Sequence, residues 1–101
     1  MLDKRIKFHE SYIEEEYNTI TFYFIAPKDL FDNIDKETDY VELSVECPRE
    51  YISSSYSTVE YSPVEYNKKN QTYIPYDWRD IELPYEEIDE LIKLAEEKGG
   101  I

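Results

Sequence analysis

Carboxylates alternate with tyrosine and serine along two stretches, DYVELSVEC at residues 39–47 and VEYSPVEY at residues 59–66. Two carboxylates that share a buried site can act as a general acid and a general base. Carboxylates beside phenols on a surface can instead bind a cationic partner. The carboxylates supply the opposite charge, and each tyrosine buries a large area at low entropic cost. The chain has 24 acidic residues among 101, so neighbouring acids arise by chance and give little support for catalysis.

Other reactive groups are few. A phosphate-binding loop needs glycine, and the two glycines, Gly99 and Gly100, lie within the last three residues. Nucleophilic catalysis needs an activated serine or cysteine beside a base. The chain has one cysteine, Cys47, which is expected to face the core, and one histidine, His9, which is expected on a strand near solvent. No catalytic residue is therefore predicted.

The acidic segment DNIDKETD, residues 32–39, carries oxygen ligands of the type that calcium prefers. It lacks the glycine and the alternating ligand spacing of an EF-hand loop, so we interpret it as a solvated acidic loop. Neither a metal nor another cofactor is predicted. The candidate ligands that this interpretation sets aside are Asp32, Asp35, Glu37 and Asp39.

The net charge of −13 is divided almost evenly between the two halves of the chain, −7 for residues 1–50 and −6 for residues 51–101. A field of this sign repels free nucleic acid and anionic membranes and attracts basic protein surfaces. We therefore expect a protein partner with a basic surface, and neither direct nucleic-acid binding nor membrane binding. A simpler interpretation is that the acidity only keeps a small protein soluble.

The sequence shows no sign of export or membrane insertion. The first ten residues lack the apolar run of a signal peptide, and no segment approaches the roughly 20 apolar residues of a membrane span. We therefore expect a cytoplasmic protein. Abundant Lys, Asn, Tyr, Ile and Glu with only two Ala and two Gly suggest an AT-rich coding sequence, as in a low-GC bacterium or one of its phages.

Alternating apolar residues predict most of the strands. Residues 5–27 predict two strands that turn near residues 16–18, the second of them apolar on both faces. A short helix is expected after Pro27, followed by the acidic loop. Residues 39–47 predict the clearest strand, with Val41, Leu43, Val45 and Cys47 facing inward and Tyr40, Glu42, Ser44 and Glu46 facing outward.

A hairpin is predicted from residues 52–66 and 72–78, which flank a polar turn. Pro63 cannot donate a hydrogen bond to a neighbouring strand, so it predicts an edge strand or a bulge. Such a bulge would place Val64 on the same face as Val59.

Residues 83–100 predict a helix, because Pro84 suits the first helical position and acids follow it at the positive end of the helix dipole. A glycine at the end can adopt the left-handed cap. The predicted apolar stripe consists of Tyr85, Ile88, Leu91, Ile92 and Ala95.

Together these elements predict one α+β domain, residues 1–101, in which an antiparallel sheet of four to five strands is covered on one face by the C-terminal helix. The other face is expected to present acids and tyrosines to a partner, and the helix is expected to add a second acidic ridge. The predicted partner-binding residues are Tyr40, Glu42, Glu46, Tyr56, Glu60, Trp78, Glu86 and Glu90.

Carboxylates at alternate positions of a strand recur every ~6.6–6.8 Å, and phosphates along one DNA strand advance by ~3.4 Å each. A row such as Glu42 and Glu46 could therefore imitate part of a phosphate track. In composition and size the chain resembles the small acidic DNA-mimic inhibitors of phages and mobile elements, which block restriction, CRISPR or repair enzymes. The alternatives are an interaction module that binds through tyrosines without DNA mimicry, and a small enzyme that uses a carboxylate pair.

Overall fold

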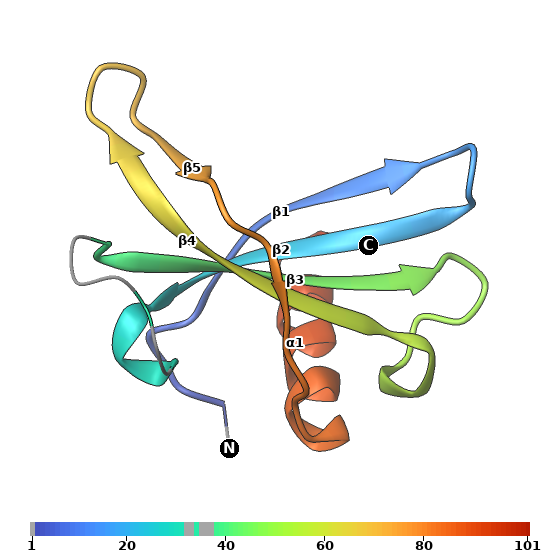
Figure 1. The fold of residues 1–101 in the computed structure, drawn as a ribbon. Helices are drawn as coiled ribbons and strands as arrows, with labels where there is room; N and C mark the ends of the chain where they lie inside the picture. Colours follow the sequence, from blue (N-terminus) through green and yellow to red (C-terminus); the bar gives the residue numbers. More distant parts are fainter. Residues whose placement is uncertain (1, 32–33, 35–37) are drawn as a thin grey trace.

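Five strands pair in chain order into one antiparallel sheet, β1-β2-β3-β4-β5, and a sixth short strand, β6, pairs with β4 beside β5 (Figure 1). The computed structural model describes residues 2–31, 34 and 38–101. The predicted α+β class with a C-terminal helix is confirmed. The elements are β1 Lys7–Glu14, β2 Thr19–Pro27, β3 Tyr40–Pro48, β4 Thr58–Asn67, β5 Thr72–Pro75, β6 Arg79–Asp80 and α1 Tyr85–Glu97, with 3-10 turns at Lys28–Leu30 and Ser54–Tyr56.

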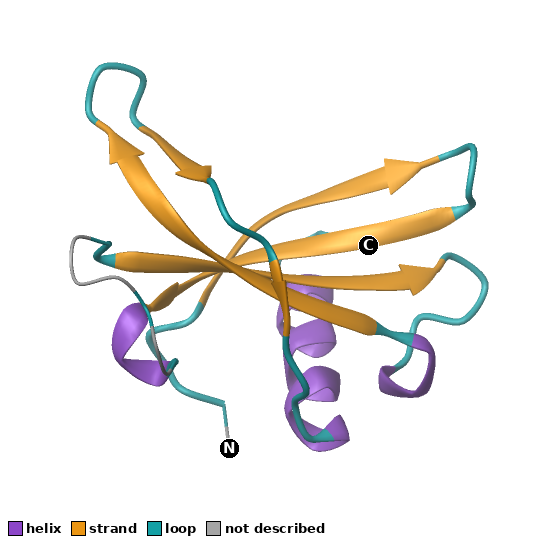
Figure 2. Ribbon diagram, in the orientation of Figure 1, coloured by secondary structure: helices purple, strands orange, loops and turns teal. Residues whose placement is uncertain are grey.

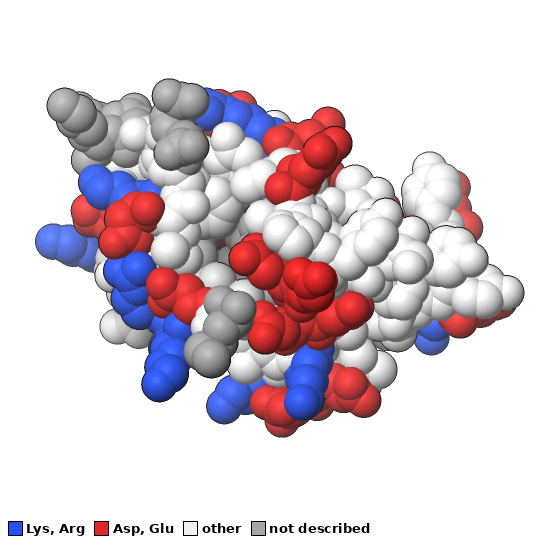
Figure 3. All heavy atoms as spheres, turned by 90° about the horizontal axis from the view of Figure 1, so that it is seen from below, with Lys and Arg blue, Asp and Glu red and all other residues white. Residues whose placement is uncertain are grey.

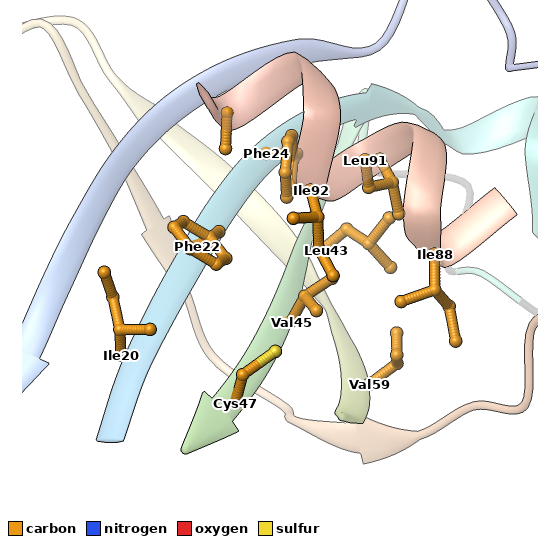
Figure 4. Packing of buried hydrophobic residues seen from close by; sticks show 11 residues of the cluster. Ile20, Phe22, Phe24, Leu43, Val45, Cys47, Val59, Ile88, Leu91 and Ile92 are labelled. Atoms are coloured by element: carbon orange, nitrogen blue, oxygen red, sulfur yellow. The ribbon is translucent and has the colours of Figure 1, made fainter. Parts of the chain in front are cut away.

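The helix α1 covers one face of the sheet. In Figure 2 the helix lies below the sheet, whereas β1 and the β4–β5 hairpin rise above it. We call the uncovered side of the sheet the open face. Phe22 and Phe24 of β2 meet Leu91 and Ile92 of α1 in the core (Figure 4). Cys47 is fully buried in this cluster, as predicted. Within the described residues, no helix has the length and apolarity that a membrane crossing requires.

The short helix predicted after Pro27 is a 3-10 turn at Lys28–Leu30. Of the acidic loop that follows, Asp32, Asp35 and Glu37 lie outside the described residues, and Asp39 is exposed.

The predicted bulge at Pro63 is wrong. The register between β3 and β4 runs without a shift, with Pro63 opposite Val41. Consequently Val64 is buried on the open face, whereas Val59 faces the helix. Pro63 fits because its polar backbone edge points away from β3: its carbonyl accepts a hydrogen bond from the N–H of Tyr76 at 3.3 Å. At this point β5 has ended, so β4 has no strand partner that needs the missing N–H.

A bulge occurs in β1 instead. Phe8 lies opposite Phe24, but the next pair is Glu10 opposite Tyr23, so His9 is an extra residue in the strand. A bulge of this kind bends a strand and redirects the side chains beyond it. Its consequence is that Glu10 joins Tyr23 on the open face.

The predicted apolar stripe of α1 is confirmed except at its first position. Ile88, Leu91, Ile92 and Ala95 are buried, whereas Tyr85 is 65% exposed. Tyr85 is the first residue of the helix and borders a hollow that serine residues of the Ser54–Ser57 segment line together with aliphatic side chains, so most of its own side chain stays in solvent.

Two glycines close the end of α1. Gly99 has φ +82°, and the N–H groups of Gly99 and Gly100 donate to the carbonyls of Glu96 and Ala95 at 3.2 and 2.8 Å. This is the Schellman arrangement, in which the left-handed residue is usually glycine.

We expect Gly99→Ala to lower the free energy of unfolding by about 1–2 kcal/mol, because a Cβ atom is strained in the left-handed region. Urea unfolding followed by circular dichroism measures the effect, with Lys98→Ala as the control, since Lys98 has φ −95°. Equal losses in the two variants would contradict this account of the cap.

Candidate functional site: the open face of the sheet

A hollow of about 420 Å³ lies on the open face, and we call it the Glu42 hollow. Figure 1 shows β1 and the β4–β5 hairpin rising on either side of the sheet, away from α1. Strands β1, β2, β3 and β5 contribute side chains, and so does the loop after β5. The hollow is lined by His9, Glu10, Tyr12, Tyr23, Glu42, Tyr73, Pro75 and Trp78.

Glu42 forms the floor of this hollow. It lies on β3 between Ile25 of β2 and Ser62 of β4, and only 4% of its surface is exposed. Burial and, secondarily, the charge of Glu10 raise the pKa of the Glu42 carboxyl to about 7. The expectation that Glu42 faces solvent is therefore wrong, although it does point away from the helix. The side chains that flank the hollow cover it, and alternation along one strand does not reveal such cover.

Tyr23 stands beside Glu42 at the centre of the acidic side chains. Its ring centroid is 6.2 Å from that of Trp78. Burial, followed by the negative charge of four carboxylates, raises the pKa of the Tyr23 phenol. The open face thus concentrates negative charge around one tyrosine; the four carboxylates belong to Glu42, Glu10, Glu46 and Glu60.

Trp78 is held in place by the loop between β5 and β6, which Figure 2 shows crossing from one strand to the other. The buried hydroxyl of Ser62 accepts hydrogen bonds from the N–H groups of Tyr76 and Asp77, at 3.1 and 2.9 Å. On the other side of Trp78, Arg79 is paired with Asp77 at 2.6 Å. Both neighbours of Trp78 are thereby held, and its indole packs beside the Tyr23 ring with the two planes tilted by 58°.

A group of tyrosines extends the open face beyond the Glu42 hollow. The ring of Tyr73 lies 5.2 Å from that of Tyr40 and 5.0 Å from that of Tyr66, measured between centroids. Tyr76, in the loop after β5, is hydrogen-bonded through its hydroxyl to that of Thr38. Tyr40 and Tyr66 are about two-fifths exposed, so they present phenols to a partner while packing on Tyr73.

The structure brings together five of the predicted partner-binding residues. Tyr40, Glu42, Glu46 and Glu60 share the open face, and Trp78 packs on it. The other three, Tyr56, Glu86 and Glu90, lie on the 3-10 turn before β4 and on α1.

Tyr56 packs on Tyr51 in the 3-10 turn before β4, with ring centroids 5.2 Å apart. Glu86 is exposed on α1, and Glu90 is half-buried, with its Oε2 atom buried and without a hydrogen-bond partner.

Sequence analysis missed the contribution of β1 and β5 to this site. Glu10, Tyr12 and Tyr73 line the Glu42 hollow without having been predicted there. The bulge at His9 has no proline or glycine to announce it, so the face occupied by Glu10 could not be assigned. Ser62 is the signal that was available: a serine within an apolar strand, beside a proline, indicates a hydroxyl that hydrogen-bonds nearby backbone.

The helix side of the molecule carries acids in a different pattern. Seen from that side, the acidic atoms form several separate groups, and Lys and Arg atoms gather mostly along one margin (Figure 3). The acidic atoms of the described residues form no continuous stripe across this view. Among the described residues no group of three or more His, Cys, Asp or Glu side chains is arranged to hold a metal ion.

Comparison with protein-family models, with curated proteins and with solved structures gives no match. The site is therefore interpreted from its own chemistry.

Proposed function

We propose that this protein is a non-enzymatic binding protein whose open face engages a basic surface on a partner protein. The observation that carries the proposal is the placement of four acidic residues around Tyr23, on the face of the sheet that α1 leaves uncovered (Figure 1). Glu10 lies opposite Tyr23 on β1, Tyr23 pairs with the residue between Glu42 and Glu46 on β3, and Glu60 follows on β4. A net charge of −13 adds long-range attraction to a cationic surface. The tyrosines beside the acids supply area that can be buried at low entropic cost.

The more specific form of this function is DNA mimicry, with a restriction, CRISPR or repair enzyme as the partner. Glu46 and Glu60, on adjacent strands of the open face, support it as exposed and half-exposed carboxylates. Glu42 supports it less, because a buried carboxyl with a pKa of about 7 is not a fixed charge like a phosphate. The alternative form is an accessory module of a phage or mobile element that binds through Tyr40, Tyr66 and Tyr73.

A second candidate function, a small carboxylate-based enzyme, is favoured by one observation. The raised pKa of Glu42 beside Glu10 and Tyr23 is the kind of perturbation that acid–base catalysis uses. The two functions differ in stoichiometry. A binding protein forms a stable complex with an unchanged partner, whereas an enzyme chemically alters a captured molecule when present in catalytic amounts.

The proposal predicts that binding depends on the open face and not on total charge. Purified protein should capture a partner from a low-GC bacterial lysate in a salt-sensitive complex. The double variant Glu46→Gln/Glu60→Gln should bind that partner on the order of tenfold more weakly, because two charges at the contact are lost. The matched control is Glu96→Gln/Glu97→Gln, which removes two exposed charges from the end of α1.

Equal weakening by the two double variants would show that only net charge matters and would contradict the proposal. Labelled DNA should not shift with the protein at low salt, and a clear shift at micromolar protein would also contradict it. Competition by added DNA distinguishes the two forms of the function: displacement of the partner supports DNA mimicry, and its persistence supports the accessory module.

A further inference from the structure

No cationic side chain among the described residues pairs with the Glu42 carboxylate. The residues that line the Glu42 hollow include no lysine or arginine, and within the described part of the chain Glu42 makes no hydrogen bond or ion pair. Among the lining residues the one imidazole is that of His9, whose Nε2 lies 4.0 Å from Oε1 of Glu10. A buried ionised carboxylate without a partner is unfavourable. A cation that enters the hollow can therefore pair with Glu42 and does not have to displace another cation from it.

The walls of the Glu42 hollow are aromatic. Four of the eight lining residues are aromatic: Trp78 and Tyr23, whose ring centroids are 6.2 Å apart, and Tyr12 and Tyr73. Aromatic faces attract organic cations through their quadrupoles, with tryptophan the strongest. A hard metal ion prefers a shell of oxygen ligands, and this hollow offers two carboxylates among rings. Its chemistry therefore selects a desolvated organic cation.

We propose that the Glu42 hollow binds one arginine side chain of the basic partner, with the guanidinium over the Trp78 and Tyr23 rings and hydrogen-bonded to Glu42. The inference rests on the proposed function and names the anchor that the open face would recognise. A guanidinium is planar, stacks on aromatic rings, pairs with a carboxylate through two parallel hydrogen bonds and loses hydration more easily than an ammonium. The volume of about 420 Å³ lies within the range of small-ligand sites.

The test uses small probes and needs no partner protein. Trp78 is the only tryptophan, so its fluorescence and its indole N–H resonance report on the Glu42 hollow directly. The probes are N-acetyl-arginine methylamide, the neutral isostere N-acetyl-citrulline methylamide and the corresponding lysine derivative, each titrated at pH 8. At that pH the Glu42 carboxyl is mostly ionised, because its pKa is about 7.

We expect the arginine probe to bind at least tenfold more tightly than the citrulline probe, and more tightly than the lysine probe. Glu42→Gln should reduce arginine binding about tenfold, to the level of citrulline, whereas the control Glu65→Gln, at an exposed site on β4, should leave it unchanged. Tyr23→Leu keeps the carboxylate and removes one ring, and it should weaken arginine binding several-fold. Amide spectra of each variant verify that it is folded.

Equal responses to arginine and citrulline, or an unchanged affinity in Glu42→Gln, would overturn the inference. Tighter binding of the lysine probe would overturn the assignment of arginine. Failure of partner capture together with successful probe binding would refute only the proposed function. If the wild type captures the partner, Glu46→Gln/Glu60→Gln loses it, and the wild type binds no arginine probe, only the proposed arginine anchor is refuted.

Discussion

Glu42→Gln is expected to stabilise the protein at pH 8 by roughly 3 kcal/mol and to leave its stability near pH 4 almost unchanged. Burial raises the pKa of the Glu42 carboxyl from its usual value of 4.5 to about 7 in the folded state. Below pH 4.5 the group is protonated in both the folded and the unfolded chain, and its carboxyl costs nothing. As the pH rises toward 7 the unfolded chain ionises first, so stability falls, by about 1.4 kcal/mol for each unit of pKa difference.

Urea unfolding of the wild type and the variant between pH 4 and pH 8 measures this effect. The difference between them should grow between pH 4.5 and about 7 and then level off. Glu46→Gln is the matched control, because Glu46 lies four residues along the same strand, on the same face, and is exposed. A difference that stays constant with pH would contradict the assignment. The other ionisable groups that line the Glu42 hollow are present in both proteins, so the difference between the two curves reports Glu42 together with its interaction with Glu10; these groups are His9, Glu10, Tyr12, Tyr23 and Tyr73.

A carboxyl that destabilises the fold at neutral pH calls for an explanation in function. Natural proteins retain destabilising groups mostly where a site requires them. An arginine bound to Glu42 would restore part of the lost stability, because a ligand that binds only the folded state stabilises it. The same substitution is thus expected to make the free protein more stable and to abolish its anchor.

The strands and the helix that build the core could be predicted from the sequence. In β3 the alternation Val41, Leu43, Val45, Cys47 has the period of a half-buried strand, and these side chains are the buried ones. In α1 the helical spacing of the apolar residues predicted the helix. The flanking Pro84 and the two glycines predicted where it begins and ends. These signals are local, because each depends on residues within one element.

The candidate site could be predicted only in part, because its features depend on contacts between elements. The burial of Glu42 depends on the side chains of β1, β2 and β5 and on Trp78. Pro63 suggested a bulge, yet a proline is tolerated without one where its edge of the strand has no partner. The bulge formed at His9, in a stretch with no unusual residue. Strand pairing decides both outcomes, and sequence periodicity does not encode it.

Leu91→Ala is expected to lower the free energy of unfolding by about 2–5 kcal/mol. Leu91 is fully buried between α1 and the sheet, in the cluster that includes Phe24 and Leu43 (Figure 4). The substitution removes buried apolar surface and leaves a cavity that the sheet can fill only partly. Alanine is also a better helix former than leucine, so the loss can be attributed to packing and not to helix propensity. For a domain of this size such a loss is a large fraction of the total stability.

Tyr85→Ala on the same helix separates packing from the mere removal of an apolar side chain. The predicted stripe included Tyr85 together with Leu91, but Tyr85 is 65% exposed. Its replacement should therefore change the free energy of unfolding by no more than about 0.5 kcal/mol. Urea unfolding of both variants, at one pH, makes the comparison. Comparable losses at the two positions would mean that the first turn of α1 is packed, and that the core extends to the Ser54–Ser57 segment instead of ending at Ile88.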